Sequence, residues 1–124
     1  MSSRTLTVEG YVRRPRVVPQ STDEVSIVFE SAAARRGWRL ARILHENSDS
    51  ERLDEALRRV ESGETDGLVV RRLADLGPNL PEAVAAIDRI MAAGGTLLSV
   101  SDAIELGPNT GALIWRLLVA LAEW

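Results

Sequence analysis

Residues 66–70 of the chain read Asp-Gly-Leu-Val-Val, and this short apolar run decides the class of fold. A continuous apolar stretch flanked by polar residues is typical of a strand that is buried on both faces of a sheet. A similar run, Thr-Leu-Leu-Ser-Val, lies at residues 96–100. Between the two runs, apolar residues recur at helical spacing from Leu80 to Met91, which predicts a helix. Strand, helix and strand in this order form the crossover unit of a parallel sheet.

The ends of this helix carry recognisable signals. Asn79-Leu80-Pro81-Glu82 has the form of a capping box with proline in the first turn, so we expect the helix to begin there. Gly94-Gly95 closes it, since glycine is the preferred residue just beyond a helix C-terminus.

The same alternation continues toward the N-terminus. The patterns predict a strand at residues 5–13, a helix that the capping box Ser21-Thr22-Asp23-Glu24 begins and Gly37 ends, a strand at residues 38–44, and a helix from about Ser50 to Gly63. We therefore expect one α/β domain over residues 1–124, with a small, mainly parallel sheet flanked by helices and no separate DNA-binding domain. In such folds functional groups gather at the carboxyl ends of the strands.

The amino-acid composition excludes several kinds of site. The chain has 124 residues, of which 45% are hydrophobic and 27% charged, and it contains no cysteine and a single histidine, His45. Disulfides, thiol catalysis and a Cys/His metal site are excluded on these counts, so we expect no metal and no cofactor. No secretion signal or membrane span is evident, which predicts a cytoplasmic protein. We interpret His45 as an ordinary polar residue and Trp38 as part of the core.

All fifteen basic residues are arginines, against eighteen acidic residues, and the net charge is −3. A nucleic-acid surface normally shows a basic excess, so binding to DNA is possible but not favoured by the charge. Two local basic strips stay open as candidates. They are Arg13, Arg14 and Arg16, the DNA-binding candidates, and the group Arg35, Arg36, Arg39 and Arg42.

The last segment, residues 109–124, is unusually apolar. Between Ala112 and Ala122 only Arg116 is charged. A helix that is apolar on every side must be covered on every side, which predicts a subunit interface and hence a homodimer or higher oligomer. The alternative is a helix seated in a groove of its own domain. The candidate interface residues are Trp115, Leu118, Val119 and Trp124.

Several short motifs, in order, resemble one family. They are Tyr-x-Arg at residues 11–13, Arg-Gly-Trp at 36–38, Gly-x-x-Asp-x-Leu-Val-Val-x-Arg-Leu at 63–73, Leu-Gly-x-Asn at 76–79, Gly-Gly-Thr-Leu-Leu-Ser-Val at 94–100, Asn-Thr-Gly-x-Leu at 109–113 and Leu-Ala-Glu at 121–123. In this order and spacing the chain resembles the N-terminal catalytic domain of the serine recombinases, the resolvases and invertases. The resemblance implies a flavodoxin-like sheet and a C-terminal helix that makes the dimer.

The resemblance also implies a chemistry. In that family a serine hydroxyl attacks a phosphodiester of DNA while clustered arginines neutralise the phosphate, as a weak nucleophile and a developing charge require. The family's Tyr-x-Arg-x-Ser segment reads here with Arg13 in place but with Pro15 at the serine position. In the family, the helix that follows the second strand normally begins with an arginine that contacts the phosphate, and Ser50 stands at that position here.

The largest departure is at the family's Leu-Asp-Arg-Leu-x-Arg motif. Ala74 replaces the aspartate, Asp75 replaces one catalytic arginine and Pro78 replaces the other. A negative charge beside a phosphate is repulsive, so we expect the enzymatic activity to be lost. One alternative is that an insertion has moved the nucleophile to Ser21, which we otherwise interpret as a helix cap.

Three hypotheses follow for function. The first is a catalytically inactive resolvase-like domain, regulatory or accessory, that acts through homo-oligomerisation and protein association. The second is a DNA-associated accessory protein of site-specific recombination or transcription. The third is residual phosphoryl chemistry that uses Ser21, or a carboxylate such as Asp75 or Asp102.

Overall fold

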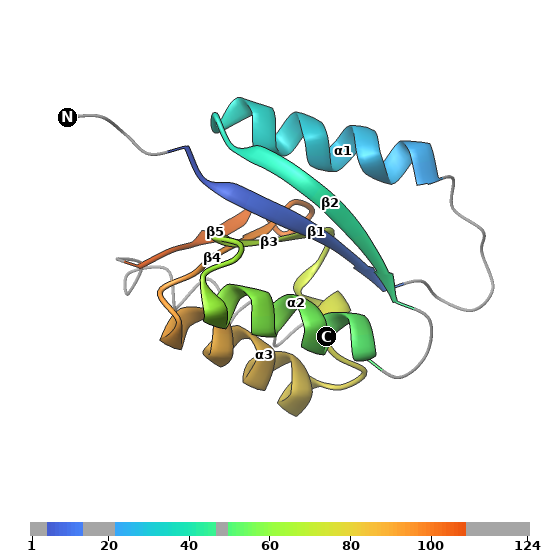
Figure 1. The fold of residues 1–124 in the computed structure, drawn as a ribbon. Coiled ribbons are helices and arrows are strands. Elements are labelled where there is room, and N and C mark those ends of the chain that lie inside the picture. Colours follow the sequence, from blue (N-terminus) through green and yellow to red (C-terminus); the bar gives the residue numbers. More distant parts are fainter. Residues whose placement is uncertain (1–4, 14–21, 47–49, 109–124) are drawn as a thin grey trace.

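The computed structural model describes residues 5–13, 22–46 and 50–108 (Figure 1). Strands and helices alternate through most of this part of the chain. In order, they are β1 (Thr7–Arg13), α1 (Thr22–Arg35), β2 (Arg39–Glu46), α2 (Glu51–Ser62), β3 (Gly67–Val70), the short 3-10 helix η1 (Leu73–Leu76), α3 (Leu80–Ala92), β4 (Thr96–Ser99) and β5 (Ile104–Leu106).

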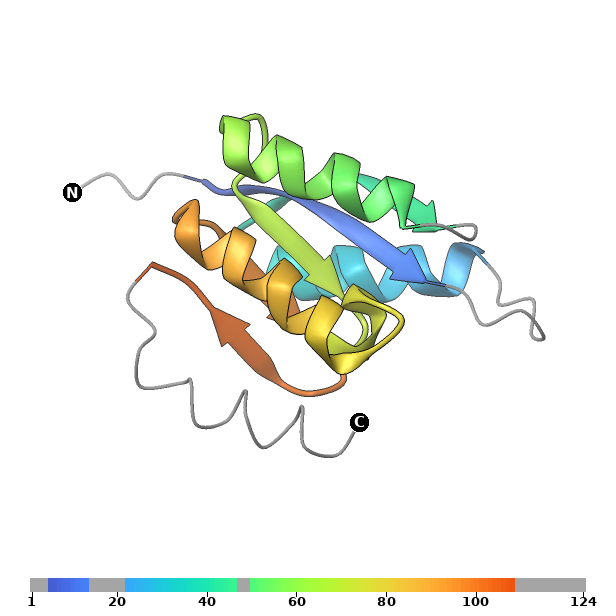
Figure 2. The ribbon, with the colours of Figure 1, turned by 90° about the horizontal axis from the view of Figure 1, so that it is seen from below.

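The five strands form one sheet in the order β2-β1-β3-β4-β5. The first four are parallel, and β5 runs antiparallel to β4. This is the strand order of the flavodoxin-like doubly wound sheets, in which the chain reverses its direction of progress between β1 and β3. Helix α1 covers one face of the sheet, and α2 and α3 lie together on the other (Figures 1 and 2). The expected α/β class and mainly parallel sheet are confirmed.

Each helix layer has its own core. Under α1 the core contains Val8 and Val12 of β1 packed with Phe29 of the helix. The larger core, under α2 and α3, contains the central strand residues Leu68 and Val70. The apolar runs at residues 66–70 and 96–100 thus supply both faces, as a sheet covered on both sides requires.

Strand β1 alternates strictly between the two layers. On the α1 side, a Cβ at Gly10 would come within 2.5 Å of the Phe29 ring, so only glycine lets the helix lie this close. On the α2 side, every second position carries a polar residue: Glu9, Tyr11 and Arg13. Their hydrogen-bond partners belong to β2, α2 and η1. This polar row of β1 brings the candidate site together.

The helix boundaries agree with the capping signals. The Asn79 side chain accepts a hydrogen bond from the Glu82 backbone N–H at 3.0 Å, which is the predicted capping box of α3. Gly63 ends α2 with a φ of 81°, a left-handed conformation that favours glycine. Helix α1 begins at Thr22, immediately after Ser21, which lies outside the described residues.

Some sequence-based expectations need correction. Strand β2 extends to Glu46, so His45 is its penultimate residue and does not follow the strand. The short helix η1 and the edge strand β5 were not predicted, because four and three residues are too few to show a period. Trp38 packs partly buried against the α1 core, as expected, with the Arg36 guanidinium 5.7 Å from its ring centroid.

Two further expectations concern the C-terminal segment and membrane spans. The segment 109–124, with the predicted interface residues, lies outside the described residues. Among the helices of the described part, none combines the length and the apolar character needed to span a membrane.

Candidate functional site

The carboxyl ends of the parallel strands bring together several of the residues that the sequence singled out and that the structure describes. Arg13, the last residue of β1, is central among them. Its Nε donates to the backbone carbonyl of Asp75 at 3.2 Å, and its Nη2 donates to the Ser50 hydroxyl. The one arginine that the resemblance retains therefore ties β1 to the N-terminal end of α2 and to η1.

Ser50 holds an unusual position. It is the N-cap residue of α2 but has a φ of 58° and makes no side-chain cap, so its hydroxyl is free to accept from Arg13. A left-handed φ is uncommon for a residue with a Cβ and typical of a tightly constrained turn.

The cap that Ser50 does not supply comes from the end of β2. Glu46, only 4% exposed, accepts hydrogen bonds from the backbone N–H groups of Leu53, at 3.0 Å, and Arg52, at 3.3 Å. A carboxylate at a helix N-terminus is stabilised by the unpaired N–H groups and the helix dipole. The buried Tyr11 hydroxyl donates to the same carboxylate at 2.9 Å. The pKa of Tyr11 is raised far above its ordinary value, mainly by burial and next by this hydrogen bond to Glu46.

Asp75, which the resemblance aligns with a catalytic arginine, is 5% exposed within η1. Burial raises its pKa, while the nearby positive charges of Arg72, Arg71 and Arg13 act in the opposite direction. The nearest of them, Arg72, has its Nη2 3.8 Å from the Asp75 carboxylate. A carboxylate in this position disfavours the approach of a second anion.

Asp102 is a candidate reactive carboxylate in the third hypothesis. In the structure its hydrogen bonds are to groups that hold the fold together. It accepts from the Leu73 backbone N–H at 2.8 Å and from the buried Ser99 hydroxyl at 2.7 Å. These bonds hold η1 against the end of β4. The Asp102 oxygen that accepts both hydrogen bonds therefore positions η1.

Of the two remaining motif positions, Ala74 and Pro78, only Pro78 lines a pocket. Ala74 is half-buried in η1, while Pro78 is exposed. Pro78 and Ser50 line a pocket of about 230 Å³ between α2 and α3, with an apolar lining that includes Leu53 and Leu57. Asp54 and Glu82 place carboxylates on its wall.

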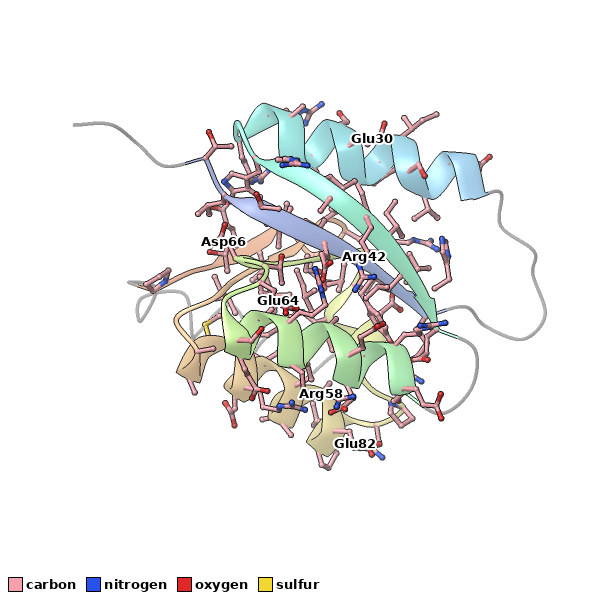
Figure 3. The ribbon with its side chains drawn as sticks, in the orientation of Figure 1. Glu30, Arg42, Arg58, Glu64, Asp66 and Glu82 are labelled. Atoms are coloured by element: carbon pink, nitrogen blue, oxygen red, sulfur yellow. The ribbon has the colours of Figure 1, made fainter. Side chains whose placement is uncertain are left out.

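A second polar cluster was missed by the sequence reasoning. Glu9, in the middle of β1, is fully buried and lies between two arginines. Arg42 of β2 donates to it at 2.7 Å, and Arg59 of α2 donates to both of its oxygens at 3.0 and 3.1 Å. Figure 3 shows Arg42 and Glu64 on the α2 side of the sheet, where Glu64 pairs with Arg59 at 2.8 Å. The sequence did contain a signal for this cluster. The alternation of residues along β1 puts Glu9 on the same face of the sheet as Tyr11.

Comparisons with known proteins identify the family and the fold. Residues 18–124 match the family model described as the N-terminal domain of resolvase. The chain belongs to the resolvase family. No curated protein shows a significant match to it.

Two solved structures share the fold of this resolvase-family domain. The N-terminal catalytic domain of TP901-1 integrase is similar with a TM-score of 0.73 and 18% identity, over 94% of each chain. A resolvase family site-specific recombinase from Streptococcus pneumoniae is similar with a TM-score of 0.66 and 15% identity, over 96% of this chain and 88% of that one. Identities this low support a common fold only.

The matched residues begin after the Tyr11–Pro15 segment of the resolvase-family domain. Pro15 and the alternative nucleophile Ser21 lie outside the described residues, as do Arg14 and Arg16. The reading of Pro15 as the nucleophile position therefore stays a prediction.

Two of the four arginines of the second basic strip are paired with carboxylates. Arg36 pairs with Glu105 of β5 at 2.6 Å, and Arg42 pairs with Glu9. Arg35 and Arg39 are exposed. Among the described residues, no group of three or more His, Cys, Asp or Glu side chains is placed to hold a metal ion.

Proposed function

We propose that this resolvase-family domain does not break DNA and acts through protein association, as a regulatory or accessory homo-oligomer. The main support is the position of Asp75. The resemblance implies a catalytic arginine at this position. In this chain the residue is a buried aspartate, and its backbone carbonyl accepts a hydrogen bond from Arg13. Phosphoryl transfer needs preorganised cations around the phosphate, and here a cation is replaced by an anion.

The state of Arg13 adds to this argument. Its guanidinium donates to Ser50 and to Asp75 within the domain. These two bonds use two of the five N–H donors of the guanidinium, so fewer donors are left for a phosphate. Glu46 likewise holds the first free N–H groups of α2, where an anion would otherwise be stabilised.

The test of lost catalysis is a covalent-adduct assay. The chain, alone and fused to a sequence-specific DNA-binding domain, is incubated with supercoiled plasmid and with a nicked duplex that traps cleavage. We expect no protein–DNA adduct on a denaturing gel in either form. An adduct would overturn the proposal, and its loss in Ser21→Ala but not in Ser26→Ala would identify Ser21 as the nucleophile.

A second function, DNA association without cleavage, has one observation in its favour. The side chains of Arg72 and Arg52, at the carboxyl edge of the sheet, are 58% and 53% exposed. The net charge of −3 argues against it. Fluorescence anisotropy with labelled duplex DNA separates the two: binding at low salt that falls steeply as salt rises supports DNA association, and no binding at low salt excludes it.

A further inference from the structure

The pocket between α2 and α3 is open and has an apolar lining. Leu57 of α2, Leu76 of η1 and Ala86 of α3 line it and are otherwise buried. Its volume of about 230 Å³ is below the roughly 300–1,000 Å³ of pockets that enclose drug-sized ligands. The size therefore suits a single side chain better than a whole free ligand.

The charged groups around this pocket are not balanced. Asp54, on the α2 wall, pairs with Arg58 at 2.9 Å and with Arg89 of α3 at 3.1 Å. Arg89 also pairs with Glu61 at 2.8 Å. Glu82, near the start of α3 (Figure 3), is exposed and forms no ion pair with the described residues. Three carboxylates thus face two guanidinium groups, and the uncompensated negative charge is that of Glu82.

The helix ends at the pocket do not reverse this preference. Glu46 accepts from the first free N–H groups of α2, and the Asn79 side chain accepts from the Glu82 N–H of α3. The positive ends of both helices are therefore partly satisfied within the domain. Arg13 does not line the pocket and donates to the Ser50 hydroxyl at its edge. The pocket favours a cation over an anion.

We propose that this pocket takes an arginine side chain of a protein partner, with the guanidinium at Glu82 and the aliphatic stem against the apolar lining. A long basic side chain buries its stem along apolar surface and keeps its charged end in water. The guanidinium is more weakly hydrated than an ammonium group and binds a carboxylate through two parallel hydrogen bonds. Arginine is also common among the residues that anchor protein interfaces.

This inference rests on the proposed protein association and adds the chemistry of a partner. The pocket is formed by α2, η1 and α3, whereas the predicted oligomer interface belongs to a different part of the chain. Occupation of the pocket and oligomerisation can therefore be measured separately.

The test is a titration of the ¹⁵N-labelled chain, followed by the backbone amide signals in NMR spectra. The probes are three blocked tripeptides, acetyl-Gly-X-Gly-amide, in which X is arginine, its neutral isostere citrulline, or glutamate. We expect the arginine peptide to shift the amide signals of residues that line the pocket, such as Leu57 and Ala86. It should bind about two- to fivefold more tightly than the citrulline peptide, as an exposed ion pair contributes. The glutamate peptide should not bind.

Two variants of α3 locate the effect. Glu82→Gln removes the charge and keeps a residue that suits the capping box. In this variant the arginine and citrulline peptides should bind about equally, because the ion pair is lost. Asp88→Asn is the matched control, since it also removes one negative charge from an exposed position of α3 but does not line the pocket. It should keep the preference for arginine.

The unaltered chain is enough to overturn the proposal. Equal binding of the arginine and citrulline peptides, binding of none of them, or tighter binding of the glutamate peptide would do so. If the pocket signals shift when the protein alone is diluted, a second copy occupies the pocket, and the proposal is overturned as well. The adduct assay and light scattering test the proposed function without reference to the pocket, so failure of either proposal is recognised independently.

Discussion

Tyr11 and Glu46 form the most tightly buried polar pair of the candidate site. The phenol donates to a carboxylate that also holds the start of α2, so one glutamate joins β1, β2 and a helix terminus. Alternation alone predicts that Tyr11 is buried. Its hydrogen-bond partner is thirty-five residues away in the sequence, and only the parallel β1–β2 register brings the two together.

Tyr11 predicts a pH dependence of stability. Its pKa is raised in the folded state, so the contribution is fully present below the ordinary tyrosine pKa of about 10 and is lost as pH rises beyond it. The chain has one tyrosine, so phenolate absorbance follows Tyr11 alone. We expect no phenolate in the folded protein at the pH where free tyrosine titrates. Glu46→Gln should lower the pKa of Tyr11, since it removes the negative charge; an unchanged titration would contradict the pairing.

Asp75 predicts a second pH effect of the same sense, in a more acidic range. Its raised pKa means that the charged form is disfavoured in the folded state, so its contribution is lost as pH rises through the folded value. Asp75→Asn should therefore increase the free energy of unfolding at neutral pH and have little effect in acid. Urea unfolding at both pH values measures this, with exposed Asp88→Asn as the control. A loss of stability at neutral pH would show that the charge is favourably paired.

At the scale of elements, the Glu9 cluster joins three neighbours in space. β1 supplies the buried carboxylate, and β2 and α2 supply one arginine each. Composition records only that the chain is rich in arginine. Which arginines are paired inside and which face solvent depends on the packing of α2 on the sheet.

Glu9→Ala removes the buried carboxylate that Arg42 and Arg59 share and leaves them only their exposed partners Glu55 and Glu64. Removing one partner of a fully buried pair typically costs about 3–5 kcal/mol. Because both arginines are partly exposed and keep a second partner, we expect a smaller loss here, of about 1–3 kcal/mol. Glu55→Ala, which removes a partly exposed partner of Arg42 and Arg52, should cost about 0.5 kcal/mol or less. Denaturant unfolding of the two variants tests the difference, and equal losses would refute the role of Glu9.

At the scale of the whole molecule, the prediction concerns association. Trp115→Asp with Leu118→Asp places two charges among the predicted interface residues. We expect a monomeric mass by light scattering, or insoluble protein. Ile27→Asp, at the 65% exposed position on α1, serves as control and should keep the oligomeric mass. Unchanged mass in a soluble double variant would refute the interface assignment.

The sequence by itself determined the fold class, most element boundaries and the family. Those features rest on local signals: the apolar runs at 66–70 and 96–100, the Asn79 cap, and motifs read in order along the chain. Tertiary structure decided the partners. That Arg13 binds Ser50 and the Asp75 carbonyl, that Glu46 caps α2, and that Glu9 is buried between arginines are contacts between residues distant in the chain. Local periodicity carries no information about such pairs, because they are set by strand order and by how the helices pack on the sheet.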